Sequence, residues 1–370
     1  MTQPVRVLMV LTVRFAKNGI TNSVMNYVSR FDPARVRCDL ACPNEPGDAA
    51  RELIRRTGGE VFVLGGRNRN PIGYIRALGR IVRAREEEIV HAHGNSATLY
   101  VEMRAAKSGG APISLPHSHN TTCKMKAADR LLRGLFDRSY TQAIACSRAA
   151  GEWLYHGRPF TVLNNAIDAE RFRYNSDMRF EIRRQLGVAT NEYVFLHVGA
   201  FNEQKHQAFL LEAFALAHKS RDGAKLLLVG DGPLRGDCET LARSLSIGDR
   251  VVFLGLRDDV PALLSAADAF VLPSLHEGLP LTLVEAQCAG LPCVVSDRVT
   301  HESAITKLVS FASIDRAESY AAAMEAVERV SRAEASDEAI RLVKETGFDV
   351  STNAETLMRI YEDAHNTAGK

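Results

Sequence analysis

The stretch that decides the fold runs from residue 269 to residue 285 and reads Ala269-Phe270-Val271-Leu272-Pro273-Ser274-Leu275-His276-Glu277-Gly278-Leu279-Pro280-Leu281-Thr282-Leu283-Val284-Glu285. Its first four residues are apolar and predict a buried strand that ends at Pro273. A turn with Gly278 follows, and Pro280 suits the first position of a helix because its fixed φ is already helical. This order of strand, turn and helix indicates a βα unit of a parallel sheet.

The same alternation of strand-like and helical patterns occupies both halves of the chain and begins again after residue 168. We therefore expect an α/β protein with two facing, doubly wound, Rossmann-like domains and a ligand in the cleft between them. The expected boundaries are residues 1–167 for the N-terminal domain and 168–351 for the C-terminal domain. Residues 352–370 are expected to form a helix that packs back on the first domain.

Composition restricts the class of protein. With 370 residues, of which 46% are hydrophobic and 24% charged, the chain is globular rather than fibrous or disordered. No apolar run approaches the roughly 20 residues that span a bilayer, and the chain does not start with a signal-peptide pattern. The seven cysteines are scattered and fit reduced thiols. These features favour a cytoplasmic protein.

Positive charge is concentrated in the first part of the chain. Residues 1–150 hold 23 Lys and Arg against 12 Asp and Glu, whereas the remainder holds 23 against 32. The basic part could contact a phosphate-bearing acceptor or an anionic membrane, or could be a solvated surface without a partner. No zinc-finger, helix-turn-helix or RNA-binding motif accompanies it, so we expect no nucleic-acid partner.

Residues 124–138 combine basic and apolar side chains at helical spacing. Leu131, Leu132, Leu135 and Phe136 could pack in the core. They could equally face a membrane interface, where the Lys and Arg side chains would contact lipid phosphates. The second alternative would place the protein at the inner face of the plasma membrane as a peripheral protein.

Two carboxylates flank the helix start of the opening stretch. Backbone N–H groups at such a start, with the helix dipole, can bind a phosphate. Glu277 beside that anion site could orient a sugar through its hydroxyls, and Glu285 further along could hold a ribose. Lys205, at the opening of an expected helix over 204–218, could reach a diphosphate. Alternatively, Glu277 caps the turn while Glu285 and Lys205 are ordinary solvated side chains.

The Glu277-x7-Glu285 motif with Gly278-Leu279-Pro280 resembles the hallmark of retaining, nucleotide-sugar-dependent glycosyltransferases of family 4, which have the GT-B fold. The resemblance covers nearly the whole chain. Three segments of the first half look like the subgroup that builds bacterial capsular polysaccharides and exopolysaccharides. These segments are Asn18-Gly19-Ile20-Thr21-Asn22, His91-Ala92-His93-Gly94-Asn95-Ser96 and His117-Ser118-His119-Asn120-Thr121.

The resemblance implies that the first domain binds the acceptor and that the second binds the nucleotide-sugar. It also implies roles for the matched residues. Glu277 would contact the donor sugar near its reacting end, and His119 would face the transferred sugar from the first domain, which makes these two the candidate catalytic residues. Glu285 would hold the ribose and Lys205 would neutralise the diphosphate. The other implied donor-binding positions approach the diphosphate or the nucleobase with their backbone: Gly19, Gly278, Leu279, Pro280, Leu281, Leu256 and Arg257.

One position departs from the family pattern. Many relatives carry Arg where this chain has Ala200, beside the donor diphosphate. Of the two cations expected beside the diphosphate, only the lysine, Lys205, is therefore present. Either another basic residue supplies the missing charge, or the donor binds more weakly.

Neither a metal nor a cofactor is expected. His91, His93, His117 and His119 alternate at two strand ends, but no Cys or acidic ligand joins them at a usable spacing. No Asp-x-Asp sequence occurs, so the metal-chelating motif of the other major glycosyltransferase class is absent. A nucleotide-sugar, UDP-linked by the resemblance, would serve as co-substrate.

The sequence thus predicts a retaining, metal-independent hexosyltransferase that uses a UDP-sugar. Its acceptor would be a lipid-linked or glycan molecule in exopolysaccharide or capsule biosynthesis. A nucleotide-sugar 2-epimerase or another GT-B enzyme, such as a sugar phosphorylase, is the enzymatic alternative. A non-catalytic, nucleotide-binding partner subunit is a further alternative because Ala200 removes an expected donor ligand.

Overall fold

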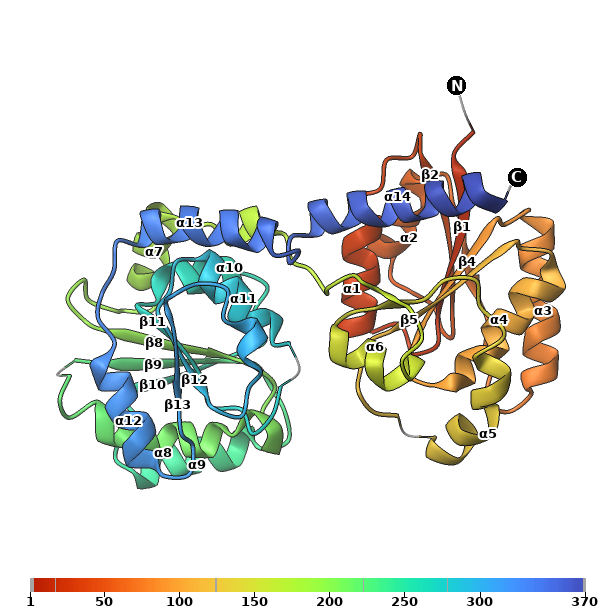
Figure 1. The fold of residues 1–370 in the computed structure, drawn as a ribbon. Coiled ribbons are helices and arrows are strands. Elements are labelled where there is room, and N and C mark those ends of the chain that lie inside the picture. Colours follow the sequence, from red (N-terminus) through yellow and green to blue (C-terminus); the bar gives the residue numbers. More distant parts are fainter. Residues whose placement is uncertain (1–2, 17, 124, 222, 278, 369–370) are drawn as a thin grey trace. The chain divides into compact units, whose positions relative to one another are not determined.

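The computed structural model describes residues 3–16, 18–123, 125–221, 223–277 and 279–368 (Figure 1). The chain divides into two compact units. Unit 1 comprises Met1–Ala166 and Asp349–Lys370, and unit 2 comprises Ile167–Phe348. Each unit has a parallel sheet with helices on both faces, which confirms the predicted α/β class with two Rossmann-like domains.

Unit 1 contains a seven-stranded sheet in the order β3-β2-β1-β4-β5-β6-β7. The strands are β1 (Val5–Leu11), β2 (Val36–Cys42), β3 (Val61–Val63), β4 (Ile89–Gly94), β5 (Ile113–Ser118), β6 (Ile144–Ala145) and β7 (Thr161–Val162). The helices are α1 (Gly19–Val28), α2 (Asp48–Arg56), α3 (Pro71–Ala84), the 3-10 turn η1 (Ala97–Leu99), α4 (Tyr100–Gly109), α5 (Lys126–Phe136), α6 (Arg148–Tyr155) and α14 (Val350–Ala368).

Unit 2 contains a six-stranded sheet in the order β10-β9-β8-β11-β12-β13. The strands are β8 (Val194–Val198), β9 (Lys225–Val229), β10 (Val251–Gly255), β11 (Ala269–Leu272), β12 (Cys293–Ser296) and β13 (Val309–Ala312). The α-helices are α7 (Ser176–Gln185), α8 (Gln207–Ala217), α9 (Arg235–Ser244), α10 (Val260–Ala266), α11 (Leu281–Cys288), α12 (Ala317–Ala326) and α13 (Arg332–Glu345). The 3-10 turns are η2 (Ala169–Phe172), η3 (Glu203–Lys205) and η4 (His301–Ser303).

The core of each unit lies on both faces of its sheet. In unit 1, α1 and α14 cover one face, and α3, α4 and α6 cover the other. In unit 2, α10, α11 and α13 cover one face, and α8, α9 and α12 cover the other. Because both faces are covered, the central strands are continuous apolar runs, as in the fully buried Ala269-Phe270-Val271-Leu272 of β11.

The last helix, α14, belongs to unit 1 although it follows unit 2 in the chain. Leu357 and Tyr361 are fully buried in the core of unit 1. On the solvent side, Arg35 binds the carboxylates of Glu355 at 2.6 Å and Glu362 at 2.7 Å. The first unit is therefore completed by a segment from the far end of the sequence.

Both sheets reverse their strand order next to their first strand. The reversal lies between β1 and β4 in unit 1 and between β8 and β11 in unit 2. In open α/β sheets, ligands bind at the carboxyl ends of the strands at such a point. The loops after β1, β4 and β5, and those after β8 and β11, are the places to look for a site.

One local prediction needs correction. The helix expected over 204–218 is interrupted, because η3 ends at Lys205 and His206 takes a left-handed conformation with φ 58° before α8 begins. In the part of the chain that the structure describes, no helix is long and apolar enough to cross a membrane.

Candidate active site

The loops after β8 and β11 bring Lys205 and Glu277 together. Lys205 Nζ lies 2.6 Å from Glu277 Oε1, and their side chains are 16% and 12% exposed. The Ser274 hydroxyl donates a hydrogen bond to the same carboxylate oxygen at 3.1 Å. An ammonium group has three donors, so Lys205 can bind a second anionic group while it stays near Glu277.

Hydrogen bonds within and between these loops hold the ion pair in place. Asn202 Oδ1 accepts a hydrogen bond from the Lys205 amide at 3.0 Å, which fixes the η3 turn. Gln204 Nε2 donates to the His276 carbonyl at 2.9 Å. The two loops therefore keep the cation and the carboxylate at a fixed separation.

Glu285 lies on α11 in a different environment. It is partly buried, and no described group donates a hydrogen bond to its carboxylate. Burial raises the pKa of Glu285 to about 7, and the positive charge of Arg171 acts in the opposite direction. The carboxylate oxygens of Glu285 can therefore accept hydrogen bonds from the hydroxyl groups of a ligand.

The start of α11 offers polar groups without protein partners. Pro280 is the N-cap residue, and the first amides of a helix have no intrahelical acceptor. Thr282 Oγ1 is buried and has no hydrogen-bond partner among the described residues. Leu279 and Leu281 are partly buried beside it, whereas Gly278 lies outside the described residues. An anion at this helix start would satisfy these donors.

Close backbone contacts at the ends of β8 and β9 require glycine. Gly230 has φ 136°, and a Cβ on it would lie 2.0 Å from the Gly199 carbonyl oxygen. A Cβ on Gly199 would lie 3.1 Å from Lys205 Cδ. These glycines let the backbone approach closely and leave room for the lysine side chain.

The remaining predicted donor-binding residues of unit 2 lie on nearby loops. Ala200 is exposed, and its carbonyl accepts a hydrogen bond from Gln207 Nε2 at 2.9 Å. Leu256 is 79% exposed directly after β10. Arg257 forms two hydrogen bonds to the Asp259 carboxylate, at 2.7 and 2.6 Å. The Arg257 side chain is thus already paired, which leaves its backbone as the group available to a ligand.

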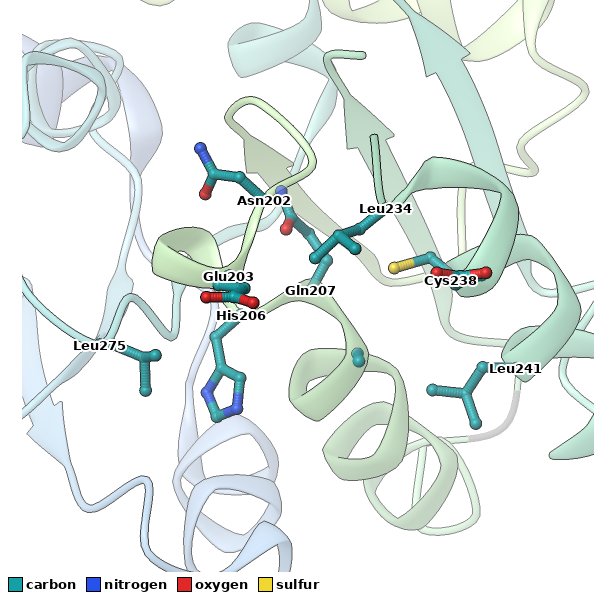
Figure 2. Close-up of a pocket in the computed structure, with 10 residues that line it drawn as sticks. Asn202, Glu203, His206, Gln207, Leu234, Cys238, Leu241 and Leu275 are labelled. Carbon is teal, nitrogen blue, oxygen red and sulfur yellow. The ribbon is translucent and has the colours of Figure 1, made fainter. Parts of the chain in front are cut away.

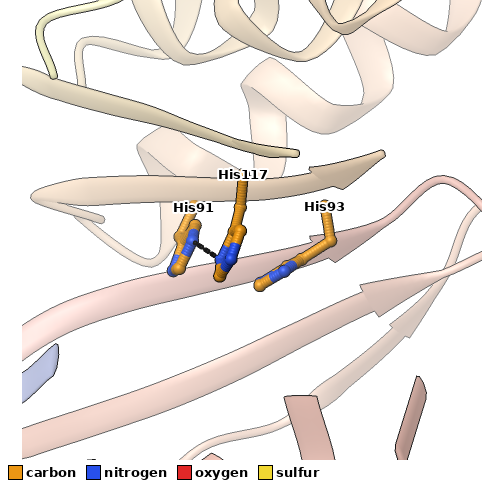
Figure 3. A group of neighbouring side chains, drawn as sticks. All are labelled: His91, His93 and His117. Carbon is orange, nitrogen blue, oxygen red and sulfur yellow. Dashed lines mark hydrogen bonds between the residues drawn. The ribbon is translucent and has the colours of Figure 1, made fainter. Parts of the chain in front are cut away.

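In unit 1, the register of β4 and β5 stacks four histidines. His91 Nε2 lies 3.2 Å from His117 Nδ1, and His93 Nδ1 lies 2.9 Å from His119 Nε2. His91 Nδ1 also lies 2.6 Å from the Tyr361 hydroxyl of α14. Figure 3 shows His91 and His117 joined by their hydrogen bond, with His93 beside them. We call these four histidines the histidine stack.

The histidine stack is neutral and incompletely hydrogen-bonded. Burial lowers the pKa of His91 to about 3 and that of His119 to about 4. His93 Nε2, His117 Nε2 and His119 Nδ1 are buried without a partner in the described chain. One nitrogen each of His91, His93 and His117 lie within 4.8 Å of one another, so these residues could hold a metal ion. The spacing argument did not foresee this, and metal independence stays a prediction.

One pocket at the switch point of unit 1 is lined by two of the predicted site residues. Its volume is about 460 Å³, and Gly19, Asn95, His119 and Asn165 are among the residues that line it. A Cβ on Gly19 would meet no atom within 4 Å, so the start of α1 faces open space. Gly19 and His119 therefore line the same pocket of unit 1, and their roles stay predictions.

A second pocket lies in unit 2 beside the η3 turn (Figure 2). It has a volume of about 570 Å³ and is lined mainly by α8, α9 and the η3 turn. Asn202, Glu203 and Gln207 face it together with Cys238 and Leu241. None of the predicted site residues lines this pocket.

Comparison with known proteins gives concordant results. A model described as "Glycosyltransferase Family 4" matches residues 17–171, and one described as "Glycosyl transferases group 1" matches residues 178–344. EpsF of Bacillus subtilis, a protein named as a glycosyltransferase, is 33% identical over 98% of this chain and 98% of its own. The chain belongs to the family 4 glycosyltransferases.

More distant relatives and solved structures extend this picture. An Escherichia coli UDP-Gal:alpha-D-GlcNAc-diphosphoundecaprenol alpha-1,3-galactosyltransferase is 30% identical over 60% of each chain. The Anabaena protein HepE, solved with UDP, has a TM-score of 0.78 at 19% identity, covering 97% of this chain and 100% of its own. A glycosyltransferase from Rickettsia africae has a TM-score of 0.82 at 14% identity, over 98% and 99% of the two chains. The fold is therefore GT-B.

Sequence reasoning missed several polar residues of this family 4 glycosyltransferase. Ser274 and Thr282 stand within the opening stretch but were given no role. Ser274 stands three residues before Glu277 and Thr282 stands five residues after it, and this closeness in the sequence was the available signal. Tyr361 contacts His91 from 270 positions away in the sequence, so no spacing could have indicated it.

Proposed function

We propose that this glycosyltransferase moves a hexose from a UDP-sugar to a lipid-linked or glycan acceptor with retention of the anomeric configuration. The observation that carries the proposal is the Lys205–Glu277 pair at the switch point of unit 2, beside the start of α11. Glu285 further along α11 has unpaired carboxylate oxygens that suit the hydroxyls of a ribose. HepE, a neighbour in fold, was solved with UDP, which supports the choice of nucleotide.

The chemistry follows from the charges at this site. As the bond between the sugar C1 and the diphosphate oxygen breaks, negative charge grows on the leaving UDP. Lys205 Nζ and the first amides of α11 stabilise that charge. The acceptor hydroxyl attacks C1 from the same face and transfers its proton to the departing phosphate oxygen. Glu277 and His119 position the sugar, and no side chain is assigned as a nucleophile.

The donor contacts divide by type of group. Glu285 accepts hydrogen bonds from the ribose, while the backbone at Leu256 and Arg257 contacts the nucleobase. Gly19, Ala200 and the segment from Gly278 to Leu281 border the diphosphate. Since position 200 supplies no cation, Lys205 bears more of the diphosphate charge than a two-cation site would require.

The reaction needs no metal or other cofactor in this proposal. The nucleotide-sugar is a co-substrate, and Lys205 takes the place of a divalent cation at the diphosphate. Activity should therefore survive treatment with EDTA. Complete loss on chelation, with recovery on addition of manganese or magnesium, would contradict this part of the proposal.

The acceptor and the location are proposed from three observations. The name of the E. coli relative gives a sugar on a diphosphoundecaprenol as its acceptor. Three segments of the first half resemble the capsule and exopolysaccharide subgroup, which supports a role in that biosynthesis. On α5, Phe136 is fully buried, whereas Leu131 is 80% and Leu135 52% exposed. The apolar face of α5 is thus divided between the core and solvent. We propose peripheral contact of α5 with the anionic, cytoplasmic face of the membrane.

The test is release of UDP from a panel of UDP-sugars, followed by mass spectrometry of the product. We expect UDP release with one sugar, and loss of turnover of roughly a hundredfold in Glu277→Gln, because the variant cannot balance the charge of Lys205 or hold the sugar. Glu203→Gln removes an exposed carboxylate from the same loop region and is the matched control. An epimerised UDP-sugar without transfer, or full turnover of Glu277→Gln, would overturn the proposal.

A further inference from the structure

A basic pocket in unit 1 lies outside the site described above. It is bordered by the segment after β5, by α5 and by the end of α6, and its volume is about 550 Å³. Lys126, Arg130 and Arg133 of α5 line it, together with His156 and the Trp153 ring. We call it the α5–α6 pocket. Such a set of side chains offers several donors to an anion.

The charges in the α5–α6 pocket are only partly balanced within the described chain. Arg133 donates two hydrogen bonds to Asp129, both at 2.7 Å, so these two residues neutralise each other. Lys126 and Arg130 form no ion pair with any residue that the structure describes. They stand four residues apart on α5, where like charges are adjacent and destabilise a helix. An anion bound between them would remove that cost.

The helix that supplies these cations also exposes apolar side chains. Leu131 and Leu135 are one turn apart and 80% and 52% exposed. A small, free anion would make no use of such side chains. A ligand that joins an anionic group to a hydrocarbon chain would contact both the cations and the leucines.

The α5–α6 pocket adjoins the pocket that contains His119. His119 and Asn120 line the switch-point pocket, and Thr121, Thr122 and Cys123 line the α5–α6 pocket. Four residues of extended chain span at most about 14 Å. A short glycan could therefore place its hydroxyl at His119 while an anionic group at its other end lies in the α5–α6 pocket.

We propose that the α5–α6 pocket binds the diphosphate of a lipid-linked glycan acceptor, with the lipid chain beside Leu131 and Leu135. Lys126 and Arg130 bind the diphosphate oxygens, and the glycan extends along residues 120–123 to place its hydroxyl near His119. This inference rests on the proposed transferase function and names the acceptor site of that reaction. It assigns the basic charge of unit 1 to a defined group of the acceptor.

The test is titration of farnesyl diphosphate into the full chain in the presence of saturating UDP, which occupies the donor site of unit 2. Lys126→Ala/Arg130→Ala should weaken binding of farnesyl diphosphate roughly tenfold or more, since two charge-assisted contacts are lost. The matched control is Arg76→Ala/Arg80→Ala, which removes two exposed cations at the same spacing from α3 and should bind like the wild type. Equal weakening in both variants, or none in the first, would overturn the proposal.

Two further arms separate the lipid from the phosphate. Leu131→Ser/Leu135→Ser should weaken binding of farnesyl diphosphate but not that of inorganic diphosphate; no effect on either would refute the lipid contact. Phosphatidylglycerol vesicles test the bilayer as the source of phosphate. The Lys126→Ala/Arg130→Ala variant could lose binding to the vesicles and still bind farnesyl diphosphate like the wild type. That result would show that the pocket binds phosphates of the bilayer, and it would overturn the proposal.

Release of UDP from the UDP-sugar panel, measured on the same preparations, separates the two levels of inference. Absence of UDP release in the wild type would overturn the transferase function. Normal UDP release, together with farnesyl diphosphate binding that is insensitive to Lys126 and Arg130, would overturn the acceptor site alone. Circular dichroism and thermal unfolding that match the wild type show that unit 1 of each variant is folded.

Discussion

At the scale of single residues, the two carboxylates of the site differ in what surrounds them. Glu277 is compensated by Lys205 Nζ and by the Ser274 hydroxyl. Glu285 is partly buried on α11, no described group donates a hydrogen bond to it, and burial raises its pKa to about 7. Glu277 thus has a cationic partner before any ligand arrives, whereas Glu285 would gain hydrogen-bond donors only when hydroxyl groups of a ligand approach it.

The first prediction concerns Glu285→Gln. Because its pKa is raised in the folded state, the wild type loses stability as pH rises from about 4.5 to 7, where the unfolded chain releases the proton first. Glutamine removes that cost, so at pH 8 the variant should be more stable by on the order of 1–3 kcal/mol. UDP should bind more weakly, since a charge-assisted contact is lost. Urea unfolding at pH 8 and pH 5, with calorimetry of UDP binding, measures both effects.

The stabilisation of Glu285→Gln should shrink toward pH 5. Equal stability of variant and wild type at pH 8 would mean that the carboxylate is solvated. Unchanged UDP affinity would remove Glu285 from the donor site. Glu203→Gln, an exposed carboxylate on η3, serves as the control for the loss of one negative charge in unit 2.

The second prediction concerns Ala200→Arg. The side chain of Ala200 is exposed and its backbone is fixed by the hydrogen bond from Gln207, so the substitution should not disturb the loop. A second cation at the diphosphate should tighten UDP binding by about 1–3 kcal/mol, less the cost of desolvating the guanidinium. Calorimetry with UDP is the measurement, and slower release of UDP should lower turnover.

Ala189→Arg is the matched control for this substitution. Ala189 is also exposed in unit 2, but it precedes β8 and so lies at the amino end of that strand. The Ala189→Arg substitution should leave the affinity for UDP near the wild-type value. Unchanged or weaker UDP binding in a folded Ala200→Arg protein would show that position 200 does not face the diphosphate.

At the scale of elements, β4 and β5 illustrate how register creates a site. His93 stands opposite His117 in the parallel ladder, and the alternation of side chains puts His91 and His119 on the same face. His91, His93 and His117 are buried and His119 is partly buried, which disfavours the charged forms of the rings. The stack is therefore stable as neutral rings and sensitive to acid.

The third prediction concerns this acid sensitivity. The pKa of His91 falls to about 3 in the fold, so below pH 6.5 the unfolded chain binds a proton that the folded chain does not. The free energy of unfolding therefore decreases as the pH falls below 6.5, by about 1.4 kcal/mol per pH unit for each such group. His91→Gln should make the dependence of the free energy of unfolding on pH shallower by about that amount between pH 6 and pH 5. An unchanged slope in chemical denaturation would contradict a neutral, buried His91.

At the scale of the whole molecule, the two units differ in how the chain builds them. Unit 2 is one continuous segment that contains Lys205, Glu277 and Glu285. Unit 1 combines residues 1–166 with α14, whose Leu357 and Tyr361 are fully buried in its core. The proposed donor-binding residues of unit 2 thus belong to a part with its own core, whereas the core of unit 1 includes the end of the chain.

The fourth prediction follows from this difference. Residues 167–348 alone should fold and retain measurable UDP binding, because the core and the paired site residues of unit 2 lie within them. Residues 1–166 alone should fail to fold cooperatively, since removal of α14 exposes the core that it covers. Circular dichroism, thermal unfolding and UDP calorimetry on the two fragments test this. A cooperative unfolding transition in 1–166 would show that α14 is dispensable.

Much of the fold and of the candidate site could be predicted from local patterns. Apolar runs such as Ala269–Leu272 predict buried strands because parallel strands are covered on both faces. Glu277, Pro280 and Glu285 could be singled out because strand, turn and helix place them at a helix start. The family and the GT-B fold, predicted from the same stretch, are confirmed. The roles of the site residues, the retaining mode and the UDP-sugar stay predictions.

The sequence by itself determined which residues form strands and helices and which motif follows β11, since these depend on neighbours within a few positions. The tertiary structure alone decided that Lys205 pairs with Glu277, that four histidines stack, and that Tyr361 of α14 meets His91. The break at His206, which local periodicity mispredicted, is also of this kind. The physical reason is that strand order and register bring distant segments together, and burial against those segments sets the charge state of each side chain.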